Sequence, residues 1–143
     1  MKFNIIHGPN LNFLGIREPE IYGHQTLDDI NQEIMAYAME NGHEVSFFQS
    51  NYEGAIIDHI QAAHFEKMDG IVINPGAFTH YSYAIHDALK SVSVPAVEVH
   101  LSAVHQREEF RKISVTAPAC IGQISGFGAD SYILGILAVI RHK

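Results

Sequence analysis

The sequence has one cysteine, few basic residues and no long apolar run among its 143 residues. A single cysteine, Cys120, excludes an internal disulfide framework and a cysteine-rich zinc site, so we expect a reducing, cytoplasmic setting. No apolar run approaches the roughly 18 residues of a membrane helix, and we expect no membrane partner. The apolar run at residues 3–6 is also too short for a signal peptide.

Charge is scarce and mostly negative. Charged residues make up 17% of the chain, only nine of them are Lys or Arg, and the formal net charge is −7. Such a chain is a poor general binder of nucleic acid or anionic membranes, so we expect neither as a partner. Apolar residues make up 47%, which is enough for a core, and the length suits one domain over residues 1–143.

Short apolar runs alternate with segments of helical periodicity. The apolar runs predict buried strands at residues 3–6, 45–48, 70–73, 96–99 and 119–124. Helices are predicted at residues 27–38, 56–63, 81–89, 106–111 and 131–141, the first of them opened by a capping box from Thr26 to Asp29. This alternation is typical of an α/β fold: a flavodoxin-like three-layer sandwich whose five-stranded parallel sheet has the order 2-1-3-4-5.

Ligands of such sheets bind beyond the carboxyl ends of the strands. The residues that follow the predicted strands are rich in amides, hydroxyls and histidines, with one arginine and one tyrosine. They are Asn10, Asn12, Arg17, Tyr22, Gln49, Ser50, Asn51, Asn74, His80, His100, Ser102 and Ser125. Together they favour acid–base chemistry on a polar small molecule, either uncharged or anionic.

Common cofactors have no matching motif. No Gly-x-Gly-x-x-Gly follows the first strand, no Gly-Lys-Ser/Thr loop occurs, and Pro9 lacks the N–H that a flavin phosphate loop would use. Asn74 stands where a phospho-receiver domain would have its aspartate. The histidines lack i, i+4 spacing, and no lysine follows a strand, so we expect no cofactor, no metal and no Schiff base.

Glu98 and His100 form the clearest pair. Residues at i and i+2 point to the same side of a strand, so the carboxylate can hold the imidazole ring and support its protonated form. The alternative for His100 is a core histidine with satisfied hydrogen bonds. Asn10 and Asn74 could likewise be turn residues, and Arg17 a surface charge.

Ordered motifs cover nearly the whole chain. They include residues 8–12 (GPNLN), 17–19 (REP), 22–23 (YG), 49–51 (QSN), 73–77 (INPGA), 79–80 (TH), 98–102 (EVHLS), 107–111 (REEFR) and 122–126 (GQISG). In this combination the sequence closely resembles the type II 3-dehydroquinate dehydratases. The resemblance implies a hydro-lyase that converts 3-dehydroquinate to 3-dehydroshikimate through an enolate, in the shikimate pathway or in quinate catabolism.

The resemblance also implies a role for each matching residue. Tyr22 as tyrosinate takes the proton, His100 held by Glu98 protonates the leaving hydroxyl, and Asn10 positions a water against the enolate oxygen. The substrate contacts that it implies are Asn74, His80, Leu101, Ser102 and Arg111, with Asp87 contributed across a subunit boundary.

A tyrosine base requires a nearby positive charge. Tyrosine ordinarily titrates near pH 10, and lowering its pKa by about three units requires roughly 4 kcal/mol. One cation at about 4 Å supplies roughly that amount at an effective dielectric near 20. Arg17, five residues before Tyr22, is the expected cation, and Arg107 is a possible helper.

Two positions depart from the family pattern. His7 replaces the usual Asn before Gly8-Pro9, and Ala103 replaces the usual Asn after Leu101-Ser102. The methyl group of Ala103 forms no hydrogen bond, so we expect some loop support to be lost. Neither change removes a residue to which the resemblance assigns chemistry.

The last predicted helix suggests an assembly. Consecutive apolar residues between positions 133 and 140 cover more than one face, which suits a helix buried on more sides than one small domain provides. Packing deep against its own sheet is the alternative. The resemblance implies trimers that assemble into a homo-dodecamer, a tetramer of trimers, with 3-dehydroquinate as the small-molecule partner.

Two other functions stay open at this point. One is a flavin-mononucleotide electron carrier on the same fold, and the other is a ligand-binding module without catalysis. Colour would identify the first, and binding of dehydroquinate without enone formation would identify the second.

Overall fold

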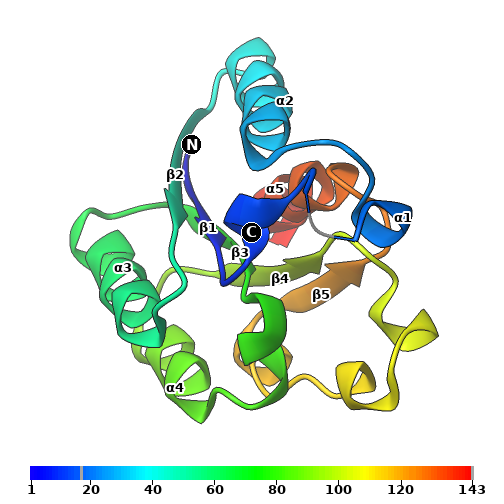
Figure 1. Ribbon diagram of the computed structural model, residues 1–143. Coiled ribbons are helices and arrows are strands. Elements are labelled where there is room, and N and C mark those ends of the chain that lie inside the picture. The colour runs from blue at the N-terminus through cyan, green and yellow to red at the C-terminus, as the bar shows by residue number, and fades with distance from the viewer. Residues whose placement is uncertain (17, 143) are drawn as a thin grey trace.

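The computed structural model describes residues 1–16 and 18–142, and for Tyr22 the backbone alone. Its sheet consists of five parallel strands in the order β2-β1-β3-β4-β5 (Figure 1). The strands are β1 (Lys2–His7), β2 (Glu44–Gln49), β3 (Gly70–Asn74), β4 (Ala96–His100) and β5 (Gly122–Ser125). This topology confirms the predicted flavodoxin-like α/β fold.

Helices cover both faces of the sheet. On one face lie α2 (Leu27–Glu40) and α5 (Asp130–His142), and on the other lie α3 (Glu53–Phe65) and α4 (Tyr83–Ser91) (Figure 1). Successive residues of β1 therefore enter different cores: Ile5 belongs to the cluster with α2 and α5, and Ile6 to the cluster with α3 and α4. A strand covered on both faces needs apolar residues at consecutive positions, which is why these strands appear as continuous apolar runs.

Capping residues set the starts of two helices. The N–H of Asp29 donates to Oγ1 of Thr26 (3.1 Å) and the N–H of Thr26 donates to Oδ2 of Asp29 (3.0 Å), which confirms the predicted capping box. Ser82 caps α4 by accepting the N–H of Ile85, so this helix begins at Tyr83, two residues later than predicted.

The segments around β5 differ most from the prediction. The predicted helix at 106–111 is two separate 3-10 turns, η3 (Val104–Gln106) and η4 (Glu109–Lys112). The fifth strand begins at Gly122 because Ala117–Ala119 forms a further 3-10 turn, η5, with a proline that has no N–H for a strand ladder. Three further short elements had no sequence signal: η1 (Leu11–Phe13), α1 (Pro19–Tyr22) and η2 (Gly76–His80).

Helix α5 is only partly covered by its own sheet. Its sheet-facing residues Tyr132, Ile136 and Val139 are fully buried, whereas Leu134 is 38% exposed. Within the described residues, no helix combines the length and the apolar character needed to cross a membrane.

Candidate active site

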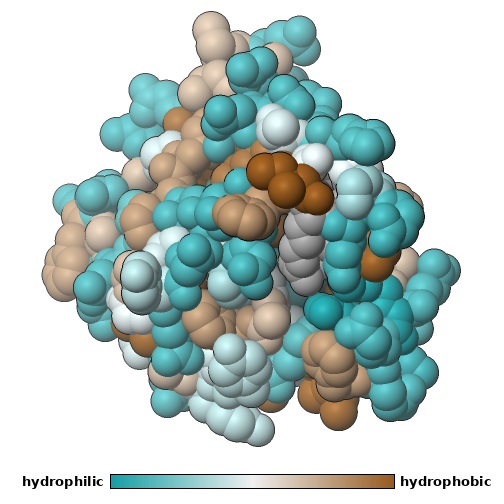
Figure 2. Space-filling model, in the orientation of Figure 1, coloured by the Kyte–Doolittle hydropathy of each residue, from teal (hydrophilic) through white to brown (hydrophobic). Residues whose placement is uncertain are grey.

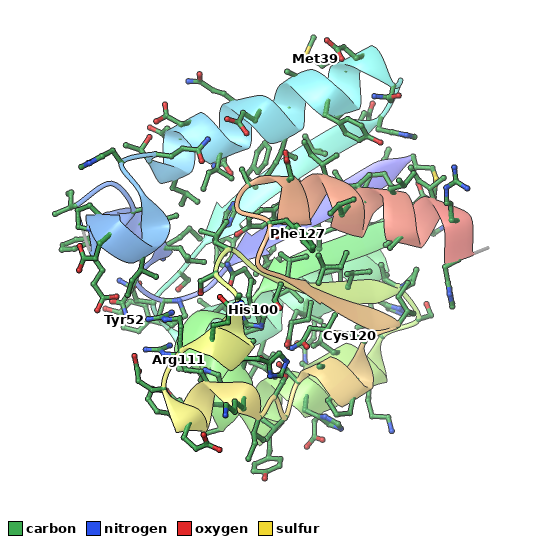
Figure 3. The ribbon with its side chains drawn as sticks, turned by 90° about the vertical axis from the view of Figure 1, so that its right-hand side faces the viewer. Met39, Tyr52, His100, Arg111, Cys120 and Phe127 are labelled. Atoms are coloured by element: carbon green, nitrogen blue, oxygen red, sulfur yellow. The ribbon has the colours of Figure 1, made fainter. Side chains whose placement is uncertain are left out.

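The strand register brings polar residues to one edge of the sheet. His7 of β1 lies opposite both Gln49 of β2 and Asn74 of β3, and His100 of β4 lies opposite Ser125 of β5. A cleft lies beyond these carboxyl ends. Its lining includes Asn10, Asn74, His80, His100, Leu101, Ser102, Arg107 and Arg111. Figure 3 shows His100 and Arg111 near one another at this end of the sheet, whereas Cys120 lies toward the opposite end.

The predicted site residues fall into three groups. Seven line the cleft, and these are Asn10, Asn74, His80, His100, Leu101, Ser102 and Arg111. Glu98 is buried behind His100. Asp87 is exposed on α4 and is not among the described residues that line the cleft of its own chain. Arg17 and the side chain of Tyr22 lie outside the described residues.

The loops after β1 and β3 touch in the floor of the cleft. The N–H of Gly8 donates to the carbonyl of Asn74 (2.7 Å). A Cβ on Gly8 would lie 2.4 Å from the carbonyl oxygen of Pro75, so only glycine fits between these loops. This close approach places Asn10 and Asn74 at the same cleft.

Asn10 is held by its backbone. It adopts a left-handed conformation (φ 68°), and its N–H donates to Oδ1 of Asn51 (3.0 Å). Nε2 of Gln49 donates to the same Asn51 oxygen (3.1 Å) and to the carbonyl of Gly8 (3.1 Å). The amides that follow β2 thus fix the loop and leave the exposed Asn10 carboxamide available to a ligand.

Glu98 and His100 make the contact that their spacing predicts. Nε2 of His100 lies 3.0 Å from Oε2 of Glu98, and the Glu98 side chain has no exposed surface. Because Nε2 is engaged, Nδ1 is the ring nitrogen left for a ligand; no other described residue bonds to it. His100 is itself buried, and it lines the cleft.

Three more side chains donate to the Glu98 carboxylate. They are Ser114 (2.9 Å to Oε2), Gln123 (2.6 Å to Oε2) and Thr116, which donates to Oε1. Burial pushes the pKa of Glu98 upward, but the hydrogen bond and charge of His100 and the bonds from Thr116 and Gln123 outweigh it and lower the pKa to about 2. The carboxylate is therefore ionised at neutral pH.

His80 faces the cleft from η2. Its Nδ1 donates to the carbonyl of Ile113 (2.8 Å), which leaves Nε2 for a ligand, and its ring packs edge-on against Phe110. His86 donates from Nδ1 to the carbonyl of Val115 (2.7 Å). The two histidines clamp the segment that carries Ser114 and therefore support Glu98 as well.

Two guanidinium groups line the cleft. Nη1 of Arg107 donates to Oγ of Ser102 (3.3 Å), and its Nη2 lies 3.7 Å from a carboxylate oxygen of Glu18, at the start of α1. Nε of Arg111 donates to Glu108 (2.9 Å), and its guanidinium lies over the Phe110 ring. The cleft therefore offers guanidinium donors to an anionic ligand although the whole chain is acidic.

A family model described as class II dehydroquinase matches residues 1–140. The chain belongs to the class II dehydroquinase family. The 3-dehydroquinate dehydratase of Clostridium beijerinckii is 60% identical over 143 residues, which cover 100% of this chain and 98% of that protein. The one from Caldicellulosiruptor bescii is 61% identical over 138 residues, 96% of this chain and 95% of that protein.

Solved structures of the dehydroquinase family share the architecture. The type II dehydroquinase of Butyrivibrio crossotus superposes with a TM-score of 0.96 at 57% identity, covering 98% of this chain and 97% of that one. The Propionibacterium acnes type II dehydroquinase gives a TM-score of 0.92 at 38% identity, covering 99% and 97%.

Sequence reasoning missed most of the contacts that support this dehydroquinase cleft. Arg107 was expected only as a helper of Tyr22, yet it lines the cleft and holds Ser102. Gln123 reaches Glu98 from 25 residues away, a separation that no local pattern encodes. Ala103, which cannot bond through its side chain, still accepts the N–H of Gln106 through its carbonyl (2.9 Å), so this turn is held by the backbone.

Proposed function

We propose that this chain removes water from 3-dehydroquinate and releases 3-dehydroshikimate, as a hydro-lyase of the shikimate pathway or of quinate catabolism. The observation that carries the proposal is the match to the family over residues 1–140, with relatives about 60% identical along the whole chain. The cleft supports it, because an imidazole backed by an ionised carboxylate stands at the carboxyl ends of the strands.

The reaction needs a base, an acid and a partner for the enolate oxygen. Tyr22 takes the proton from the carbon next to the ketone. The electron pair of the broken C–H bond forms the enolate. As the enolate collapses, the β C–O bond breaks and His100 gives a proton to the departing oxygen, which leaves as water. Nδ1 of His100 would make this transfer, because Nε2 faces Glu98, and the anionic Glu98 would stabilise the imidazolium. Asn10 would hold a water against the enolate oxygen.

The cleft is suited to an anionic, hydroxyl-rich substrate. The guanidinium of Arg111 and the ring of His80 offer donors at one side, and the amide of Asn74 offers one N–H at the floor. Ser102, held by Arg107, lies after β4 next to Leu101, whose carbonyl accepts the N–H of Gly128. The fixed backbone at this turn would bind the substrate carboxylate.

Assembly into a dodecamer, a tetramer of trimers, belongs to the same proposal. Asp87 is exposed and lies outside the described lining of its own cleft, as expected for a residue that completes a neighbour's site. Large apolar side chains are also exposed around the chain, among them Phe13, Ile16, Tyr83 and Phe110. Figure 2 shows an apolar patch near the centre of one face, over the segment that joins β1 to α1.

We place the enzyme in the cytoplasm, where its single cysteine stays reduced.

The direct test is to mix the purified protein with 3-dehydroquinate and to follow the absorbance of the conjugated enone. We expect product from the wild type, and a rate in Tyr22→Phe below a few per cent of it. Arg17→Lys should also be much slower, with its pH optimum moved upward, because a flexible point charge does not replace a planar guanidinium. Borohydride and chelators should leave the activity intact.

Three outcomes would contradict the proposal. Binding of dehydroquinate without enone would indicate a binding module, a coloured protein would indicate a flavin carrier, and substrate mass trapped on a lysine would indicate a Schiff base.

Asp87 is tested by co-expressing an Asp87→Ala chain with a Tyr22→Phe chain. Activity well above either parent supports a shared site, whereas inactive mixed assemblies would place Asp87 elsewhere.

A further inference from the structure

A second polar cluster lies next to the cleft, where α2 and α5 cover the carboxyl ends of β1 and β3. It consists of Asn31 of α2, His7 of β1, Tyr132 of α5 and Asn74 of β3. His7 and Tyr132 have no exposed surface, and Asn74 is 3% exposed. Four elements therefore bring four polar side chains together, and the buried groups of His7, Tyr132 and Asn74 each need a hydrogen-bond partner. Asn31 is half-buried.

The hydrogen bonds of this cluster run in one direction. Nδ2 of Asn74 donates to Oη of Tyr132 (3.2 Å), because an amide nitrogen has only donors to offer. Nε2 of His7 faces the acceptor Oδ1 of Asn31 (2.8 Å) and must carry a proton. In the neutral ring Nδ1 then has a lone pair, and it accepts the O–H of Tyr132 (2.8 Å).

The remaining atoms of Asn74 complete the arrangement. Its Oδ1 accepts the N–H of Gly76 (3.1 Å), which fixes the oxygen and nitrogen ends of the carboxamide. One Nδ2 hydrogen goes to Tyr132, and no other described residue takes the second. Asn74 lines the cleft, so this second hydrogen is available to a ligand.

We propose that Tyr132 and His7 are positioning residues, which hold the Asn74 carboxamide in one orientation so that its free N–H meets the substrate. The proposal rests on the proposed function, in which Asn74 binds substrate. The neutral state of His7 agrees with its burial, which lowers the pKa of the ring to about 4 against the opposing effect of the Asn31 hydrogen bond.

Tyr132→Phe tests the proposal, because it removes one oxygen from a buried ring. We expect the KM for 3-dehydroquinate to rise about tenfold, the order found when a buried polar group loses its partner, and kcat to change less than threefold. A merely structural role would lower the active fraction, and hence kcat, at an unchanged KM. In an Asn74→Ala background, Tyr132→Phe should raise KM no further.

The variants at His7 give an independent reading, and they suffice if Tyr132→Phe does not fold. Oδ1 of an asparagine and Nδ1 of histidine are both bonded to Cγ, so His7→Asn can still accept the Tyr132 hydroxyl. His7→Asn should keep KM within threefold of the wild type, whereas His7→Phe should raise it as Tyr132→Phe does.

Two matched controls separate positioning from stability. Tyr37→Phe removes a hydroxyl outside the cluster, and Ile136→Val removes a methyl group one turn from Tyr132 in the same core. Both should leave KM unchanged, although Ile136→Val lowers Tm. If the wild type forms product and both Tyr132→Phe and His7→Phe have the wild-type KM, the positioning role is wrong and the proposed function stands. A wild type without product overturns the proposed function.

Discussion

The two buried polar clusters of the molecule differ in the charge that burial leaves on them. At β4, four donors surround the Glu98 carboxylate, and the effect of His100, Thr116 and Gln123 on its pKa exceeds the opposing effect of burial. At β1, His7 lies between one donor and one acceptor, and burial decides its pKa, which falls to about 4. One cluster therefore keeps an anion and the other keeps a neutral ring.

The difference shows how similar burial can serve two tasks. A buried ion is stable only where several hydrogen bonds replace its hydration, and Glu98 has them. Such an anion can stabilise a cation at His100 next to the reacting atoms. The His7 cluster has no charge and exerts no such field, so what it can supply is orientation. Each of the following predictions breaks one cluster and leaves the other intact.

The largest effect is expected from His100→Ala, which removes the general acid and the charged partner of Glu98. The rate of enone formation should fall by about 10²–10⁴-fold, the usual contribution of a general acid. His105→Ala is the matched control, because this neighbouring histidine is exposed and lies outside the cleft lining. A His100→Ala rate close to that of the control would show that His100 is not the acid.

The pH dependence of stability should separate the clusters. Between pH 6.5 and 4 the unfolded chain takes up a proton at His7 that the folded chain refuses, so stability falls as pH falls. Glu98 acts likewise between pH 4.5 and 2. Each shift corresponds to about 3 kcal/mol.

Urea unfolding at a series of pH values measures these two windows. His7→Asn should flatten the curve between pH 6.5 and 4, and Glu98→Gln should flatten it between pH 4.5 and 2. The two residues would be wrongly assigned to these pH ranges if Glu98→Gln removed the pH dependence of stability between pH 6.5 and 4. The same would follow if His7→Asn removed it between pH 4.5 and 2.

A smaller effect on rate is expected from Glu98→Gln. His100 keeps a polar neighbour, but the neutral amide no longer supports the imidazolium, and the rate should fall by roughly tenfold, less than for His100→Ala. Glu44→Gln at an exposed position is the control. If Glu98→Gln were as silent as Glu44→Gln, the pairing would have no part in catalysis.

The smallest effect on stability is expected from Ser114→Ala, which removes one of the four donors to Glu98. The free energy of unfolding at pH 7 should fall by about 2 kcal/mol, because a hydrogen bond to a charged group contributes roughly 1.5–3 kcal/mol. Ser114 also accepts the N–H of Ala117 (2.9 Å), and this bond is lost as well. Ser93→Ala, on the surface, should change it by less than half as much. Equal effects would mean that Ser114 contributes nothing through Glu98.

The parallel sheet could be predicted because its central strands are buried on both faces and leave continuous apolar runs, as at residues 70–73. The strand order could be predicted because five strands that alternate with helices suit the flavodoxin-like arrangement. The Glu98–His100 contact could be predicted because i, i+2 geometry is local. The turns η3 to η5 could not, since single turns leave no periodicity. The contact of Tyr132 with His7, 125 residues apart, is set by the packing of α5 on the sheet and has no local signal.

The central claim is that the balance between burial and hydrogen-bond partners decides the charge of each buried cluster: the donors outweigh burial at Glu98, and burial outweighs the Asn31 hydrogen bond at His7. An NMR pH titration of the wild type, observing the Glu98 carboxyl carbon and the His7 ring nitrogens, tests it most directly. We expect Glu98 to stay ionised to below pH 3, and His7 to stay neutral, with its proton on Nε2, to below pH 5. Titration of Glu98 near pH 4.5, or of His7 near pH 6.5, would contradict the account.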